Sequence, residues 1–181
     1  RRRRKTRPPY TTMSAASECA EWIDRGRAHQ WEGRPVDAML CFRRASRADP
    51  AAPDPQFVLG EVLWQLGLAS DAVSAWREAT RLDPAYLAPW QALSEALRAA
   101  DDTAGARAAA ERVLALAPGN ARAQLVRAIN GLADDPAAAG VVVKVLEQEP
   151  TLAAVPTLAA PLAVALDRAP AGDARTSVLA W

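Results

Sequence analysis

Apolar residues in this chain follow the spacing of amphipathic helices, and the pattern repeats at an interval of thirty-four residues. Within one unit, Phe57, Leu59, Val62, Leu63 and Leu66 fall at helical spacing. The same interval separates small residues, which are Gly26, Gly60 and Ser94 and, twelve positions later, Ala38, Ala72 and Ala106. We expect the first set to lie against the second where the two helices of each pair come closest. A fixed period of this length predicts an all-α solenoid built from helix pairs, each pair covering the next.

Polar residues and prolines mark where the helices are expected to begin and end. A proline closes each unit, at Pro50, Pro84 and Pro118. Side-chain oxygens that accept from free backbone N–H groups predict helix starts at Ser70 and Asp71, at 101–103, at Asn120, and at Asp135 before Pro136. Residues 140–146 alternate as a strand would, but their phase within the repeat favours a helix.

Taken together, these positions resemble the pattern of the tetratricopeptide repeat family, with three clear repeats and a divergent fourth. The matching residues are Trp22, Gly26, Gly33, Ala38, Phe42, Ala45 and Pro50 in the first repeat, Leu59, Gly60, Gly67, Ala72, Trp76, Ala79 and Pro84 in the second, and Trp90, Leu93, Ala106, Val113 and Pro118 in the third. The resemblance implies a right-handed superhelix of antiparallel helix pairs. We expect repeats at 19–52, 53–86, 87–120 and 121–150, within an array spanning 17–150.

Charge is concentrated at the start of the chain. Six of the 22 basic residues lie in 1–7. The other 16 basic residues and the 21 acidic residues give the rest of the chain, its body, a net charge near −5. An acidic body argues against a nucleic-acid partner. Residues 1–16 are either a disordered or added leader, or a basic tail that binds phosphate or serves as an address.

The remaining composition points away from membranes and from catalysis. No segment approaches the roughly twenty apolar residues that a membrane span needs, so we expect a cytoplasmic protein. Cys19 and Cys41 are too far apart along neighbouring helices to pair, and we expect two free, buried thiols. The sequence holds no phosphate loop, metal-ligand cluster or nucleophile motif, so no catalytic residue, metal, cofactor or enzyme activity is predicted.

Recognition of a protein or peptide is therefore the expected function, because the resemblance implies a concave face lined by the first helix of each repeat. The residues expected to bind the partner are Arg27, Trp31, Phe57, Glu61, Trp64, Gln91, Glu95, Arg98 and Arg122. Ile23, Leu125 and Ile129 are also expected on this face. For Trp31 and Trp64, packing between neighbouring repeats is the alternative, whereas Trp22, Trp76 and Trp90 fall at core positions.

Two known uses of the family's groove can be compared by residue identity. Chaperone-binding members hold a terminal carboxylate with Lys, Asn and Arg side chains, but here Ile23, Asp24, Arg27 and Val58 stand near those places. Members linked to sugar transferases carry an asparagine ladder, which is replaced here by Asp24, Val58, Ala92 and Val126. The groove is instead predicted to take a partly apolar peptide or helix with mixed charge.

The repeat pattern fades after Pro150. Residues 151–181 are predicted either to cap the last repeat or to be a segment truncated within a longer polypeptide, whose exposed apolar face would cause self-association. Two functions follow. The chain is a scaffold or adaptor for a partner protein, or it is the N-terminal substrate-recognition module of a larger bacterial enzyme such as a repeat-linked glycosyltransferase.

Overall fold

The computed structural model describes residues 14–131, 137–154 and 163–164. Within them the chain is helical and has no strand. The helices are α1 (Ala15–Trp31), α2 (Pro35–Ala48), α3 (Asp54–Gln65), α4 (Ala69–Leu82), α5 (Leu87–Ala99), α6 (Thr103–Leu116), α7 (Ala121–Gly131) and α8 (Ala138–Gln148), followed by the 3₁₀ helix η1 (Pro150–Ala154).

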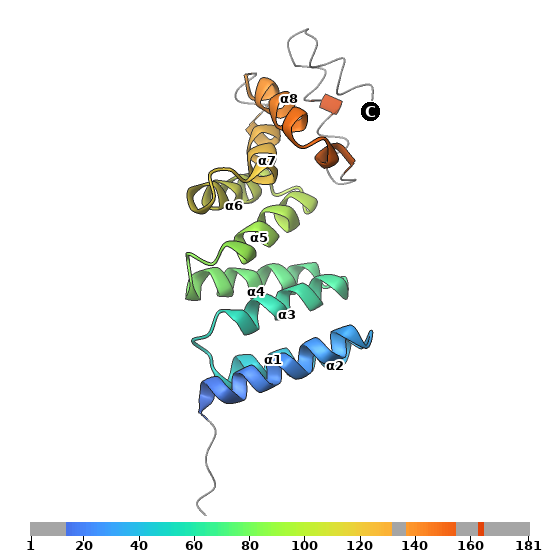
Figure 1. Cartoon of the computed structure of the whole chain (residues 1–181), viewed down its shortest axis with the longest axis vertical. Coiled ribbons are helices and arrows are strands. Elements are labelled where there is room, and N and C mark those ends of the chain that lie inside the picture. Colours follow the sequence, from blue (N-terminus) through green and yellow to red (C-terminus); the bar gives the residue numbers. More distant parts are fainter. Residues whose placement is uncertain (1–13, 132–136, 155–162, 165–181) are drawn as a thin grey trace, which may run out of the picture.

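The helices pack in chain order. The pairs are α1 with α2, α3 with α4, α5 with α6 and α7 with α8, and each pair contacts the next through its second helix. Figure 1 shows these pairs stacked along the long axis of the molecule, from α1 and α2 at one end to α7 and α8 at the other. The predicted all-α solenoid is confirmed, and the segment 140–146 lies in a helix.

Proline ends the second helix of every pair. Asp49, Asp83, Ala117 and Glu149 each precede a proline, and each has left the helical conformation, with φ between −133° and −140°. The proline ring disfavours a helical residue before it, so the helix must stop there. Asp49 and Asp83 also accept hydrogen bonds from the backbone N–H two residues on, at 3.1 and 2.9 Å. These turns start the next pair.

A left-handed residue closes the first helix of the first three pairs. Gly33, Gly67 and Asp101 occupy equivalent positions with φ of 71°, 76° and 58°. The backbone N–H of the residue after each one donates a hydrogen bond to a carbonyl in the last turn of the helix, as Leu68 N–H does to the Leu63 carbonyl at 2.9 Å. This is the Schellman motif, which favours glycine because other residues are strained at positive φ. In the third pair an aspartate carries that strain.

The predicted helix starts are partly correct. The Asp102 carboxylate accepts from Gly105 N–H at 2.9 Å, and the Asn120 side chain accepts from Ala123 N–H at 2.9 Å. The prediction for Ser70 and Asp71 is wrong, because α4 begins at Ala69 and its cap position holds Leu68, without a side-chain cap. The Schellman turn starts the helix one residue earlier than expected. Asp135 lies outside the described residues.

Each of the first two pairs is held close by a glycine facing an aromatic ring. A Cβ placed on Gly26 would overlap the Phe42 ring, and one on Gly60 would overlap the Trp76 indole. The sequence had suggested alanines as the facing residues, namely Ala38 and Ala72. Those alanines are buried, but the group that fills the glycine's space lies four residues further along the helix.

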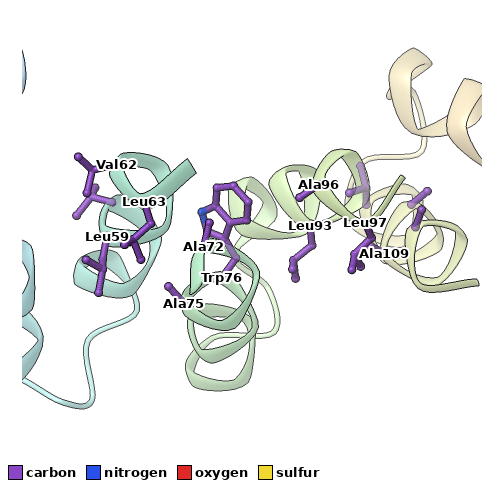
Figure 2. Packing of buried hydrophobic residues seen from close by; sticks show 14 of the residues in the cluster. Leu59, Val62, Leu63, Ala72, Ala75, Trp76, Leu93, Ala96, Leu97 and Ala109 are labelled. Carbon is purple, nitrogen blue, oxygen red and sulfur yellow. The ribbon is translucent and has the colours of Figure 1, made fainter. Parts of the chain in front are cut away.

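One hydrophobic core runs through the middle of the solenoid. Figure 2 shows the Trp76 ring of α4 between Leu63 of α3 and Leu93 of α5, all of which belong to one buried cluster. Of the three tryptophans predicted in the core, Trp76 is buried and Trp90 is partly buried at the edge of this core. Trp22 is also partly buried, but it packs against a separate cluster formed by Cys19, Ile23 and Ala45.

Cys19 and Cys41 are both buried and free, as expected. Within the described residues no helix is long and apolar enough to cross a membrane. The predicted leader has only 14–16 described, where Ser14 caps α1. The C-terminal segment has only 151–154 and 163–164 described, so its predicted capping or self-association lies largely outside the described residues.

Replacing Gly60 with alanine tests the glycine–ring packing. The added methyl meets the Trp76 indole in a closely packed interior, so Gly60→Ala should lower the free energy of unfolding by about 1–3 kcal/mol. The matched control is Gly140→Ala in α8, where a methyl meets nothing and should raise stability by about 0.5 kcal/mol. Urea unfolding measures both, and equal effects of the two substitutions would contradict the packing described.

Relieving the strained aspartate should stabilise the third pair. Asp101→Gly should raise the free energy of unfolding by about 0.5–1 kcal/mol, because glycine adopts positive φ without a steric penalty. The reverse change at the equivalent turn, Gly67→Asp, should lower it by about 1 kcal/mol. Thermal unfolding of both variants checks the sign, and a loss of stability in Asp101→Gly contradicts the expectation.

Candidate functional site

An open hollow of about 370 Å³ lies between the first helices of the second and third pairs. We name it the central hollow; it is lined by Phe57, Glu61, Trp64, Gln65, Trp76, Ala88, Gln91, Ala92, Glu95 and Ala96. The α3 wall carries large rings, whereas the facing part of α5 carries Ala88, Ala92 and Ala96 at helical spacing. Small side chains on one wall leave the space open.

Aromatic contacts hold the side chains of the α3 wall in place. The Trp64 and Trp76 rings lie 5.9 Å apart in a tilted arrangement, and Trp76 Nε1 donates to the Phe57 carbonyl at 3.2 Å. Phe57 itself packs against Tyr86, with ring centroids 5.3 Å apart. Aromatic pairs of this kind restrict side-chain motion. Trp64 nevertheless remains 41% exposed and is available to a partner.

Glu61 brings a carboxylate to the central hollow. Within the described residues no ion pair involves Glu61, although the charge of Arg27 is near enough to act on it. Glu61 is an exposed residue, but partial desolvation of its carboxyl raises its pKa above the usual range, and the charge of Arg27 partly opposes this. Burial, followed by a hydrogen bond to Asp54, raises the pKa of Tyr86, so its hydroxyl stays protonated.

A second, smaller hollow of about 150 Å³ adjoins the first between α5, α6 and α7. It is lined by Gln91, Ser94, Glu95, Val113, Asn120, Arg122, Ala123 and Val126. Arg122 Nε donates to Glu95 Oε1 at 2.8 Å across its mouth. Burial lowers the pKa of the nearby Arg98, which stays charged because guanidinium pKa values are so high. Gln91 and Glu95 belong to both hollows, which therefore lie side by side.

The structure brings most of the predicted binding residues together. Phe57, Glu61, Trp64, Gln91 and Glu95 line the central hollow, and Arg122 lines the second hollow with the last two. Arg27 and Arg98 lie within electrostatic reach of them. Trp31 stands apart at the end of α1, where it is 93% exposed and lines neither hollow.

Three residues expected on the concave face are instead buried, so that prediction is wrong for Ile23, Leu125 and Ile129. Ile23 packs in the cluster that holds α1 on α2, and the other two pack against α8. Helical spacing alone does not distinguish the groove-facing edge of an apolar stripe from its buried centre.

Sequence reasoning also missed residues that shape the hollows. Tyr86 and Asn120 occupy the same position of successive repeats, just before a first helix, and both lie at the groove. Trp76 comes from a second helix but reaches the central hollow because Gly60 leaves it room. The thirty-four-residue interval could have linked the first two, whereas the reach of Trp76 depends on the three-dimensional packing.

In the described part of the chain, no group of three or more His, Cys, Asp or Glu residues is arranged to hold a metal ion. The two hollows combine aromatic, alanine, amide and charged side chains, and this combination is suited to recognition through contact and hydrogen bonding.

The environment of Glu61 can be tested directly by titration. An NMR titration of its carboxyl should give a midpoint above the ordinary glutamate range, and Arg27→Gln should raise it further, since Arg27 favours the charged form. Glu78 is the matched control, because its hydrogen bond with Arg81 lowers its pKa. Protonation of Glu61 should relieve a small destabilisation as the pH falls through its folded-state pKa. A Glu61 midpoint at or below that of Glu78 contradicts this description.

No protein-family model matches the sequence, and no curated protein is significantly similar to it. Solved structures of other proteins are similar to this chain in fold. A MamA structure from Desulfovibrio magneticus RS-1 is 18% identical, with a TM-score of 0.68, and the match covers 90% of this chain and 94% of that one. The first TPR of Spaghetti (RPAP3), bound to an HSP90 peptide, is 22% identical with a TM-score of 0.59, covering 65% of this chain and 96% of that one.

The Thermobaculum terrenum O-GlcNAc transferase is 18% identical, with a TM-score of 0.61, and the match covers 76% of this chain but 27% of the transferase. At these identities the likeness shows the fold and nothing more. The thirty-four-residue interval, the Schellman turns and the consecutive helix pairs agree with it. The chain has the fold of the tetratricopeptide repeat domains, an α-solenoid of helix pairs.

Proposed function

We propose that the concave face formed by α1, α3, α5 and α7 binds a polypeptide segment of a partner protein, and that the chain acts as a scaffold or adaptor. The observation that carries this proposal is the central hollow, which combines an exposed tryptophan, a second ring and a wall of alanines. Aromatic side chains in such settings supply much of the binding energy at protein interfaces.

The two hollows suit consecutive side chains of one bound segment. They share Gln91 and Glu95, so a segment that places a side chain in the central hollow brings its neighbours to the second hollow. The amide of Gln91 can pair with polar groups of such a segment, while Phe57 and Trp64 contact its apolar groups. Arg98 and Arg122 provide charge at one end of this path.

Similar structures support peptide binding in general terms. The two RPAP3 domains are described as bound to an HSP90 peptide, SRMEEVD, and an HSP70 peptide, SGPTIEEVD. Both peptides end in the sequence EEVD, which carries three acidic side chains. In this chain Ile23 and Val58, which stand near the family's clamp positions, are buried apolar residues. We therefore propose polypeptide binding without that carboxylate clamp.

The alternative is that the chain serves as the substrate-recognition module of a larger enzyme. It is supported by the similarity to the O-GlcNAc transferase, in which the region similar to this chain makes up 27% of the length. Both proposals require a polypeptide in the groove. The reading frame that encodes this chain distinguishes the two proposals. A catalytic domain encoded in the same frame favours the enzyme module, and the absence of such a domain favours the adaptor.

Selection of peptides from a random library on the full chain tests the proposal. Trp64→Ala should weaken binding of a selected peptide about thirtyfold, corresponding to about 2 kcal/mol, because it removes the most exposed ring of the central hollow. Leu40→Ala in α2 is the matched control, since it removes a half-exposed apolar side chain that lines neither hollow. Isothermal titration calorimetry measures both affinities.

Phe57→Ala and Arg98→Ala should also weaken binding. Phe57 packs on Tyr86 and against the core, so its removal should lower the melting temperature as well, and Trp64→Ala is the cleaner probe. Unchanged affinity in all three variants, with the Leu40 control equally unaffected, would place the binding surface outside the groove. Failure to select any peptide would count against peptide binding itself.

A further inference from the structure

The central hollow has a charge pattern that narrows the chemistry of its occupant. Among the residues that the structure describes, its lining includes two carboxylates, Glu61 and Glu95, and no basic side chain. Glu95 is engaged by Arg122 at 2.8 Å, whereas Glu61 has no ion pair within the described residues. The unmatched charge of the hollow is therefore negative and is located at Glu61.

Resting on the function proposed above, we propose that the central hollow receives a lysine or arginine side chain of the bound segment. Its charged head would meet the Glu61 carboxylate, and its hydrocarbon stem would lie along the alanines of α5 and the exposed face of Trp64. The site that we assign is thus specific for a long basic side chain.

The shape of the hollow supports a side chain with an apolar stem. Ala88, Ala92 and Ala96 form one wall, and the rings of Phe57 and Trp64 form the other. Lysine and arginine bury their methylene groups along such surfaces while keeping the charged head near polar groups. A cation near an indole face gains further attraction from the ring. Gln65 and Gln91 offer amide oxygens to the remaining N–H donors.

Other occupants fit less well. A purely apolar side chain would cover the Glu61 carboxylate without giving it a partner, and a covered charge without a partner is costly. An acidic side chain would be repelled by Glu61 and by Glu95. Arg27 moderates the field of Glu61, but it stays outside ion-pair distance and does not line the hollow. The raised pKa of Glu61 agrees with a carboxylate that lacks an adequate partner.

The test uses the peptides selected on the full chain. We expect the selected sequences to share one lysine or arginine position. Replacing that residue with its neutral counterpart, norleucine for lysine or citrulline for arginine, should weaken binding about fivefold to tenfold. Glu61→Gln should weaken the binding of the basic peptide by a similar factor, whereas the neutral peptide should bind no more weakly than it does to the unchanged chain. In this variant the two peptides should bind almost equally.

The control variant is Glu78→Gln, which removes a carboxylate of α4 that lines neither hollow and should preserve the preference for the basic peptide. Thermal unfolding of both variants confirms that each is folded. Selected peptides with no shared basic position, a norleucine or citrulline peptide that binds as tightly, or an unchanged preference in Glu61→Gln would overturn the inference while leaving peptide binding intact. If no peptide is selected, both proposals fail.

Discussion

The close approach of the two helices in each pair is the constraint on which the rest of the structure depends. In the first two pairs a glycine in the first helix leaves room for a ring from the second, as Gly60 does for Trp76. That ring then crosses to the groove side, where it packs against Trp64 and donates a hydrogen bond to the Phe57 carbonyl. The packing that fixes the pair therefore also fixes the aromatic wall of the central hollow. In this protein stability and the candidate binding surface share the same side chains.

The third pair keeps the fold with different residues. Ser94, Asp101 and Ala110 stand where the second pair has Gly60, Gly67 and Trp76. The change from Trp76 to Ala110 removes much more volume than the change from Gly60 to Ser94 adds. Even so, α5 and α6 pack as a pair, Ala110 is fully buried, and Ser94 lines the second hollow. The helix pair can thus retain its geometry while its sequence departs from the repeat pattern.

Much of the fold could be predicted from the sequence, because the thirty-four-residue interval and the prolines act locally. Pro50, Pro84 and Pro118 force the preceding residue out of the helix whatever the surroundings. The start of α4 was harder to predict, because the Schellman turn at Gly67 decides whether Leu68 or Ser70 takes the cap position. The repeat also placed Phe57, Glu61 and Trp64 on one surface. It did not separate them from buried Leu125, because burial depends on how the fourth pair packs.

The central claim is that a polypeptide binds in the groove between α3 and α5. The most direct measurement is a ¹H–¹⁵N NMR titration of the full chain with a selected peptide. The account predicts that the largest shifts fall on the Trp64 indole and the Gln65 and Gln91 side-chain amides, with small shifts for the exposed residues of α2 and α4. Shifts concentrated on α2 and α4, with the Trp64 indole unaffected, would contradict it.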